Sequence, residues 1–229
     1  MKLVRLPYRE ADAPTNMAID FWMLSKIDRE HGVWFRSYGW ERPAFTFGYT
    51  QRWDEVSTRI PLEGIECCRR PSGGGIVDHR NDWTYALAIS PSCHFGRQRP
   101  LDLYRMIHQA LTDTLKTFGI DCGLYETDDP DNPVSCFERP SPFDVVFHQS
   151  TRKIAGAALK RTKAGVLLQG SVDRATIPDI DDKELEGRFI RALMISGELD
   201  SQEVIEFPGD PETFTAVKEF RDPDWNHRR

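Results

Sequence analysis

The spacing of apolar residues along the chain predicts four helices. Met17, Phe21 and Leu24 recur at helical intervals, and Thr15 is placed to cap the helix that carries them. Gly119 follows a long apolar stripe and suits the left-handed residue at a helix end. The predicted helices span residues 15–28, Leu101–Phe118, Asp181–Met194 and Asp210–Phe220.

Shorter apolar runs between these helices predict strands. Trp83–Ile89 alternates large side chains with Thr84 and alanines, which predicts a half-buried strand with a second face of small residues. Asp144–His148 and Lys153–Leu159 are expected to form a hairpin, and residues 127–142 an exposed loop. The other predicted strands are Val33–Tyr38, Ala44–Gly48, Glu66–Arg69, Gly75–His79 and Val166–Val172.

The order of these elements predicts the fold class. Strands and helices do not alternate strictly, and several strands are joined by short hairpins. This favours an α+β fold with a mixed, largely antiparallel sheet flanked by helices. We expect a single domain over residues 1–229, because no linker or repeat interrupts the pattern.

Composition narrows the class of protein. The chain has 229 residues, of which 39% are hydrophobic, and its 30 basic and 36 acidic residues give a net charge of −6. The acidic balance argues against nucleic acid as a partner. The sequence has no apolar run of membrane-spanning length and no signal-peptide pattern, so we expect no membrane association. Five cysteines without a CxxC pair predict neither a disulfide framework nor a metal site, and a reducing cytoplasm is the expected location.

Three local features could carry chemistry. Arg69–Gly75 reads RRPSGGG, which would let a ligand approach the backbone beside two cations, although a plain hairpin loop has the same composition. Lys153 opens a strand of alanines and glycine that leaves space for another molecule, although a solvated strand-end lysine is also typical there. Cys136 lies in a polar loop, whereas Cys67 and Cys68 follow a strand pattern and are expected to be packing residues.

Taken together and in this order, these segments resemble the lipoate–protein ligase and octanoyltransferase family, which is related in fold to the biotin–protein ligases. The resemblance covers roughly residues 1–190. It is carried by Asn16–Asp20 (NMAID), Arg36–Trp40 (RSYGW), Phe47–Gln51 (FGYTQ), Arg69–His79 (RRPSGGGIVDH), Arg152–Arg161 (RKIAGAALKR) and Leu167–Val172 (LLQGSV).

The resemblance implies a biotin/lipoate protein ligase-like catalytic domain with an acyl tunnel. In it, Lys153 would bind the activated carbonyl. Cys136 would carry the acyl group as a nucleophile, as in the cysteine-dependent octanoyltransferases, and His79 is a candidate proton acceptor. No metal ligand is implied in the protein itself. The implied substrate-binding residues are Arg70, Ser72, Gly73, Gly74, Gly75, His79, Gly156, Ala157 and Gly170.

Three functions stay open at this point. An acyltransferase would move an octanoyl or lipoyl group from acyl carrier protein and need no cofactor. A lipoate–protein ligase would use lipoate, ATP and Mg²⁺, with Arg70 facing the phosphate of lipoyl-AMP. Relatives often have Ser, Gln and His where Ala157, Leu159 and Gln169 stand in this chain. A non-catalytic acyl- or carrier-binding protein is the third function, and the departures at Ala157 and Gln169 support it.

The implied partners are proteins that carry lipoyl groups. The acceptor would be a lipoyl domain or the glycine-cleavage H protein. Five basic residues near the proposed site could receive such an acidic partner, namely Arg152, Lys153, Lys160, Arg161 and Lys163. The chain ends soon after these motifs, which favours a transferase, or a ligase that acts with a separate protein.

Overall fold

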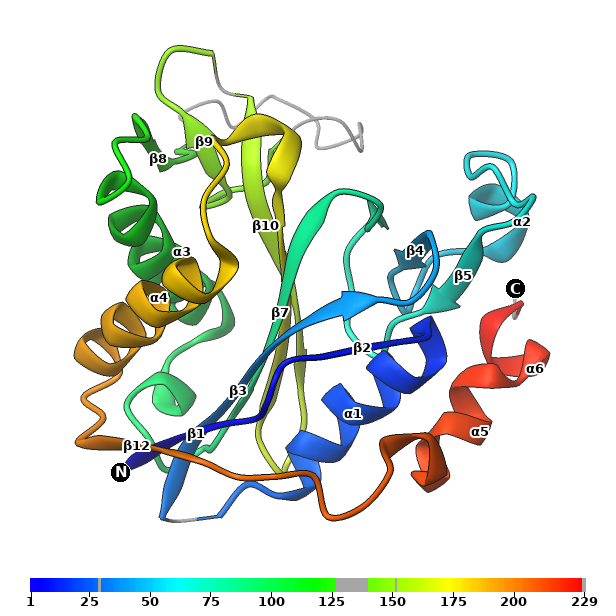
Figure 1. Cartoon of the computed structure of the whole chain (residues 1–229), viewed down its shortest axis with the longest axis horizontal. Helices are drawn as coiled ribbons and strands as arrows, with labels where there is room; N and C mark the ends of the chain where they lie inside the picture. The colour runs from blue at the N-terminus through cyan, green and yellow to red at the C-terminus, as the bar shows by residue number, and fades with distance from the viewer. Residues whose placement is uncertain (29, 127–139, 151, 228–229) are drawn as a thin grey trace.

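The computed structural model describes residues 1–28, 30–126, 140–150 and 152–227, and within them the strands form two sheets (Figure 1). The main sheet has the order β12-β1-β3-β7-β11-β10-β9-β8, with β2 beside β3. Its strands are β1 (Lys2–Arg5), β2 (Arg9–Ala11), β3 (His31–Trp40), β7 (Asp82–Ile89), β8 (Cys122–Leu124), β9 (Val145–Phe147), β10 (Lys153–Arg161), β11 (Val166–Asp173) and β12 (Ser201–Val204). The small sheet has the order β5-β4-β6, with β4 (Ala44–Phe47), β5 (Glu66–Arg69) and β6 (Ile76–Asp78).

Helices cover both faces of the main sheet. In Figure 1, α3 and α4 lie together on one side, and α1 lies on the other side with α5. The helices are α1 (Ala13–Ser25), α2 (Trp53–Val56), α3 (Pro100–Lys116), α4 (Asp182–Ser196), α5 (Thr215–Arg221) and α6 (Pro223–Asn226). Short 3₁₀ turns occur at η1 (Phe95–Arg97), η2 (Arg174–Thr176) and η3 (Pro211–Thr213). Among the described helices, none has the length and hydropathy to cross a membrane.

Strand pairing confirms the predicted α+β class. The path from β3 through β7, β11, β10 and β9 to β8 is antiparallel throughout. Parallel pairs occur where β1 joins β12 and β3, and where β2 joins β3. The predicted hairpin is confirmed, since β9 and β10 pair antiparallel.

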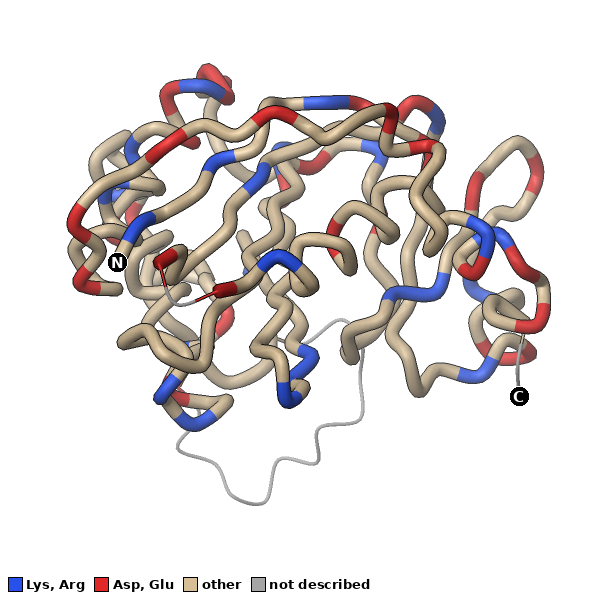
Figure 2. The backbone as a smooth tube through the Cα atoms, turned by 90° about the horizontal axis from the view of Figure 1, so that it is seen from below, with Lys and Arg blue, Asp and Glu red and all other residues tan. Residues whose placement is uncertain are grey.

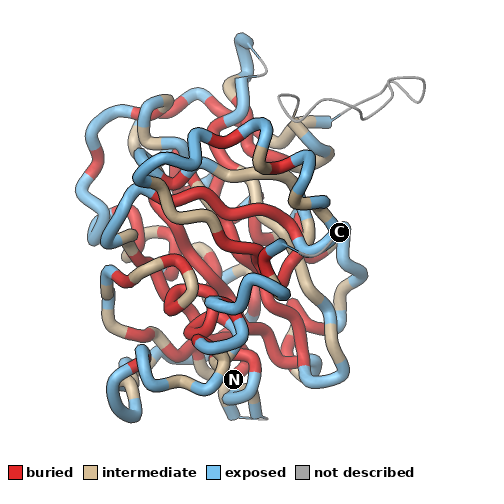
Figure 3. Tube along the Cα trace, turned by 90° about the vertical axis from the view of Figure 1, so that its right-hand side faces the viewer, coloured by how far each residue is buried: buried red, intermediate tan, exposed pale blue. Residues whose placement is uncertain are grey.

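The prediction that Trp83–Ile89 is only half-buried is wrong. Every side chain of this run is buried, because β7 lies between β3 and β11 and helices pack on both faces. Figure 3 shows that the buried segments lie in the middle of the molecule. Tyr85 and Leu87 contribute to the core under α3 and α4. Ala88 faces α1, where it meets Ile19. The small residues of the second face therefore allow close packing of a helix.

Two predictions about helix ends also need correction. Asp12, rather than Thr15, caps α1, because its carboxylate accepts the backbone N–H of Thr15 at 2.9 Å. The expected helix over Asp210–Phe220 is divided into η3 and α5, separated by extended Phe214. Gly119 does adopt the left-handed conformation after α3, with φ of +79°. Strands β1, β2, β8 and β12 were not predicted.

Candidate functional site

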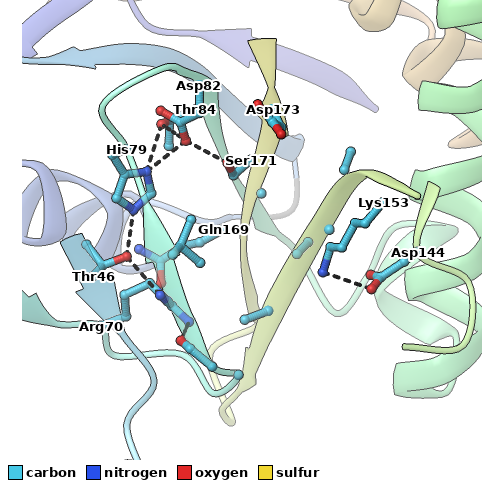
Figure 4. A pocket seen from close by; sticks show the side chains of 18 of the residues that line it. Thr46, Arg70, His79, Asp82, Thr84, Asp144, Lys153, Gln169, Ser171 and Asp173 are labelled. Carbon is cyan, nitrogen blue, oxygen red and sulfur yellow. Dashed lines mark hydrogen bonds and ion pairs between the residues drawn. The ribbon is translucent and has the colours of Figure 1, made fainter. Parts of the chain in front are cut away.

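A cavity of about 1180 Å³ lies beside β10 and β11, between the glycine-rich segment and the start of α3 (Figure 4). The predicted site residues that line it from the glycine-rich side are Arg70, Gly74, Gly75 and His79. Those that line it from the two strands are Lys153, Gly156, Ala157 and Gly170. Ser72 and Gly73 are not among the lining residues, and Cys136 lies outside the described residues.

Lys153 forms an ion pair at the cavity wall. Its Nζ lies 2.8 Å from Oδ2 of Asp144, whose side chain is fully buried while that of Lys153 is 46% exposed. The carboxylate of Asp144 also accepts the Tyr104 hydroxyl and, at 2.7 Å, the backbone N–H of Ser141. Lys153 is thus oriented by a buried partner while part of its ammonium group faces the cavity (Figure 4).

The glycine-rich segment is shaped by close backbone contacts. Gly74 has a φ of +86°, which side-chain-bearing residues rarely adopt. A Cβ on Gly74 would lie 3.2 Å from Nη2 of Arg70 and 3.3 Å from Cβ of Ala158. A Cβ on Gly48 would overlap the carbonyl oxygen of Gly74. The segment therefore lies directly against β4 and β10.

Arg70 uses both terminal nitrogens to hold this segment in place. Nη1 donates to Oγ1 of Thr46 at 2.8 Å, and Nη2 donates to the carbonyls of Gly73 and Gly75 at 2.9 Å. Burial lowers the pKa of Arg70 to about 10, so the guanidinium stays charged at neutral pH. The Arg70 guanidinium is therefore a positive charge held in place by the glycine-rich segment and Thr46.

We expect Gly74→Val to reduce acyl binding by at least about 10-fold. A β-branched side chain at positive φ costs roughly 1–3 kcal/mol of strain, and its Cβ crowds Arg70 and Ala158. Binding of octanoate to the purified variant, measured by calorimetry, tests this. Gly209→Val is the control, since Gly209 also has positive φ but no atom lies within 4 Å of its Cβ position. Normal octanoate binding by Gly74→Val would show that the loop is only a turn.

His79 is held by hydrogen bonds on both ring nitrogens. Nδ1 lies 2.8 Å from Oδ2 of Asp82, and Nε2 lies 2.7 Å from Oγ1 of Thr46. The ring stacks on Trp40, with centroids 4.1 Å apart. Since Thr46 accepts from Arg70, its own proton can go to Nε2, while Nδ1–H donates to Asp82. With both nitrogens occupied, His79 has no ring nitrogen left for a substrate proton in this arrangement.

Ser72 is part of a buried network of hydrogen bonds. Its hydroxyl donates to Oε1 of Gln169 at 2.5 Å, and Nε2 of Gln169 donates to Asp20 on α1 at 2.7 Å. Asp20 in turn forms an ion pair with Arg36, in which Oδ1 of Asp20 lies 3.3 Å from Nε of Arg36. Oδ2 of Asp20 accepts a hydrogen bond from the Tyr38 hydroxyl at 3.0 Å. Ser72 thus anchors the glycine-rich segment to α1, and Gln169 is a connecting residue of that network.

Gly170 leaves space for an aromatic ring of the protein. A Cβ at this position would overlap the Tyr85 ring, which lies beneath it in the core. The absence of a side chain at Gly170 therefore serves internal packing at the cavity wall.

Sequence reasoning missed Asp144, Tyr104 and Asp82. Asp144 is a lone carboxylate before the apolar run of β9, and Tyr104 precedes Ile107 by three residues on the apolar side of α3. A polar side chain within an apolar pattern could have indicated these residues. Such a side chain is expected to be buried, and a buried carboxylate requires hydrogen-bond or ion-pair partners.

The four described cysteines lie outside the cavity lining. Burial raises the pKa of Cys67 to about 12 and that of Cys122 to about 11, and it also raises the pKa of Cys68 and Cys93. Each is therefore a thiol rather than a thiolate at neutral pH. Cys67 and Cys68 lie in β5, as the strand pattern predicts.

The predicted docking residues do not form one compact patch. Lys160 lies over the Tyr49 ring at 5.0 Å, whereas Arg161 donates to the carbonyls of Gly96 and Gln98. Lys153 and Arg161 are at opposite ends of β10, roughly 27 Å apart at strand spacing. Figure 2 shows acidic and basic segments interspersed over the molecule. The docking role stays a prediction.

A large cavity at the edge of a mixed sheet, with a half-exposed cation at its wall, is typical of proteins that bind a small molecule. The match to the family described as lipoyl protein ligase A/B catalytic domain spans residues 12–176, and the chain belongs to this family. The resemblance stated from the sequence is thereby confirmed.

Individual relatives agree with this assignment. An octanoyltransferase LipM from Geobacillus kaustophilus is 32% identical over 67% of this chain and 57% of the relative. An octanoyltransferase LipM from Staphylococcus aureus is 32% identical over 76% of this chain and 65% of the relative. The aligned part of the chain thus spans less than two thirds of the length of these curated relatives.

Solved structures share the fold. A putative lipoate protein ligase from T. acidophilum, with bound lipoic acid, has a TM-score of 0.74 at 19% identity and covers 99% of both chains. A lipoate-protein ligase A bound with ATP has a TM-score of 0.75 at 19% identity, over 99% of this chain and 98% of the other. At such identities the likeness describes the fold alone.

Proposed function

We propose that this protein is an acyltransferase that moves an octanoyl or lipoyl group onto a lysine of a lipoyl domain without ATP. The observation that carries the proposal is Lys153, an oriented ammonium group at the wall of a cavity bordered by Gly156, Ala157 and Ala158. Such a strand leaves space for an aliphatic chain, and the cation can stabilise negative charge on the acyl oxygen.

Burial of the acyl tail alone would hold the substrate weakly. At about 0.8 kcal/mol per buried CH₂, an octanoyl tail contributes roughly 5 kcal/mol before the cost of association. That corresponds to sub-millimolar affinity at best. A covalent bond or a carrier protein must therefore retain the acyl group between the two half-reactions.

We propose Cys136 as the residue that forms this covalent bond. The other four of the five cysteines lie away from the cavity lining and have raised pKa values. Ser141 and Pro142, which follow Cys136 by five and six residues, do line the cavity. Five residues span at most about 18 Å when extended, so the length of chain between Cys136 and Ser141 permits the thiol to reach the cavity.

The proposed chemistry has two balanced steps. The Cys136 thiolate attacks the thioester carbonyl of octanoyl–acyl carrier protein, and the carrier thiolate leaves. The neutral amine of the acceptor lysine then attacks the new thioester, the carbon–sulfur bond breaks as the amide forms, and the proton lost by the nitrogen goes to the leaving sulfur of Cys136. The Lys153 ammonium would stabilise the oxyanion in both steps.

The ligase alternative would assign Arg70 to the phosphate of lipoyl-AMP. Both terminal nitrogens of Arg70 instead donate to Thr46, Gly73 and Gly75 in this structure. A guanidinium engaged with its own loop supports a structural role. ATP and Mg²⁺ are therefore not part of the proposed reaction. The departures at Ala157 and Gln169 also fit an intact site, because both the oxygen and the nitrogen of the Gln169 amide have hydrogen-bond partners and the Ala157 N–H donates to the Tyr104 hydroxyl.

Intact-protein mass spectrometry tests the proposal. We expect an octanoyl adduct on the protein after mixing with octanoyl–acyl carrier protein in the absence of ATP, followed by transfer to an added lipoyl domain. Modification only with lipoate, ATP and Mg²⁺ would favour the ligase. No modification under either condition would favour the non-catalytic alternative.

A further inference from the structure

The start of β10 contains a bulge that changes the direction of Lys153. Lys153 pairs with Val146 and Ala155 pairs with Val145, so β10 has one residue more than β9 between these pairs. Ile154 and Ala155 are both buried in the core as a result. A bulge re-aims the side chains that precede it. Lys153 therefore emerges on the same face as Gly156, three residues later.

Gly156 provides the space in which the Lys153 side chain lies. A Cβ built on Gly156 would overlap Nζ of Lys153 and lie 2.5 Å from its Cε. The same Cβ would be 2.9 Å from Oδ1 of Asp144. Real Cβ atoms essentially never make contacts this short, so a side chain at position 156 would require the end of the Lys153 side chain to move. The position that the Lys153 ammonium has in this structure therefore depends on the absence of a side chain at Gly156.

Asp144 and Tyr104 complete the arrangement from the other side. The Tyr104 hydroxyl donates to Asp144 and accepts the backbone N–H of Ala157 at 3.0 Å, so α3 is tied to β10. Burial raises the pKa of Tyr104 well above its usual value, which keeps the hydroxyl protonated. His108, whose ring contacts Tyr104, has its pKa lowered to about 4 by burial and carries no charge at neutral pH. Lys153 is thus the cation that compensates the Asp144 carboxylate.

We propose that Asp144, Tyr104 and Gly156 are positioning residues that hold the Lys153 ammonium toward the acyl carbonyl. An ammonium group has three N–H donors, and the bond to Asp144 leaves two for the substrate oxygen. Orientation by a buried carboxylate lowers the cost of ordering the long lysine side chain during the reaction. This inference rests on the proposed function, and it gives Gly156 a role different from lining the acyl chain.

A Gly156→Ala variant separates these two roles kinetically. We expect kcat for lipoyl-domain octanoylation to fall about 100-fold, with KM for the acyl donor changed by less than about 3-fold. Gly187→Ala on α4 is the matched control, because its Cβ would meet only Arg191, at 3.8 Å. A raised KM with unchanged kcat would mean that Gly156 lines the acyl chain, and the proposal would be wrong. Unchanged kinetics would overturn it as well.

Chemical labelling of lysines tests the arrangement without relying on turnover. A water-soluble amine acylating reagent is applied to wild type, Gly156→Ala and Asp144→Asn, and labelling at Lys153 is measured by peptide mass spectrometry relative to exposed Lys183. We expect labelling at Lys153 to rise several-fold in both variants, because the ammonium loses its carboxylate partner. Equal labelling in all three proteins would refute the positioning role. If the wild-type protein has no transferase activity but the two variants still show increased labelling at Lys153, the proposed function is refuted and the positioning role is not.

Discussion

Lys153→Ala is expected to reduce acyl transfer by about 100- to 1000-fold. The change removes the ammonium group that would stabilise the oxyanion, and loss of one such donor typically costs that much in kcat. The expected loss applies to transfer with or without ATP, since both reactions develop charge on the same oxygen. Rates of octanoyl transfer to a lipoyl domain, measured by mass spectrometry, provide the readout.

The same variant should also be slightly less stable than wild type. From the sequence alone, a strand-end lysine is expected to contribute little, but Asp144 is fully buried and would lose one of its partners. A cost of about 1–2 kcal/mol corresponds to a melting temperature lowered by roughly 2–8 °C. Lys183→Ala, on the exposed side of α4, is the control for both measurements. A folded Lys153→Ala protein with normal transfer would remove Lys153 from the mechanism.

Cys136→Ser is expected to abolish the octanoyl adduct and nearly all ATP-independent transfer. A serine hydroxyl has no appreciable anionic form at neutral pH, whereas a thiol with a pKa near 8.5 does, and a nearby cation favours it further. The comparison measures adduct mass and lipoyl-domain modification for wild type and variant. It is done first without ATP, and then with lipoate, ATP and Mg²⁺.

Cys67→Ser is the matched control, because Cys67 is a half-buried thiol of β5 away from the cavity lining. It should retain both adduct and transfer. Full activity of Cys136→Ser that depends on ATP would contradict the thioester mechanism and support the ligase.

Local signals in the sequence were sufficient for much of the fold. The apolar period predicted α1, α3 and α4, and alternation predicted β7. Two strand-like runs separated by a short polar turn predicted the β9–β10 hairpin. Each of these signals depends on side chains close along the chain. The glycine-rich motif also indicated a positive φ, which Gly74 adopts, whereas the close approach seen in the structure is that of the protein's own Gly48, and approach of a ligand stays a prediction. The combination of motifs identified the family.

The tertiary structure alone decided the features that join distant segments. Strand β1 forms because Lys2–Arg5 pairs with residues 201–204, and no local pattern encodes a partner so far away. The second face of β7 is buried because α1 covers it. Lys153 owes its orientation to Asp144 from before β9 and Tyr104 from α3, together with a bulge that reverses its face. A sequence specifies which groups are present, but the partners that desolvate and orient them are fixed only when the chain packs.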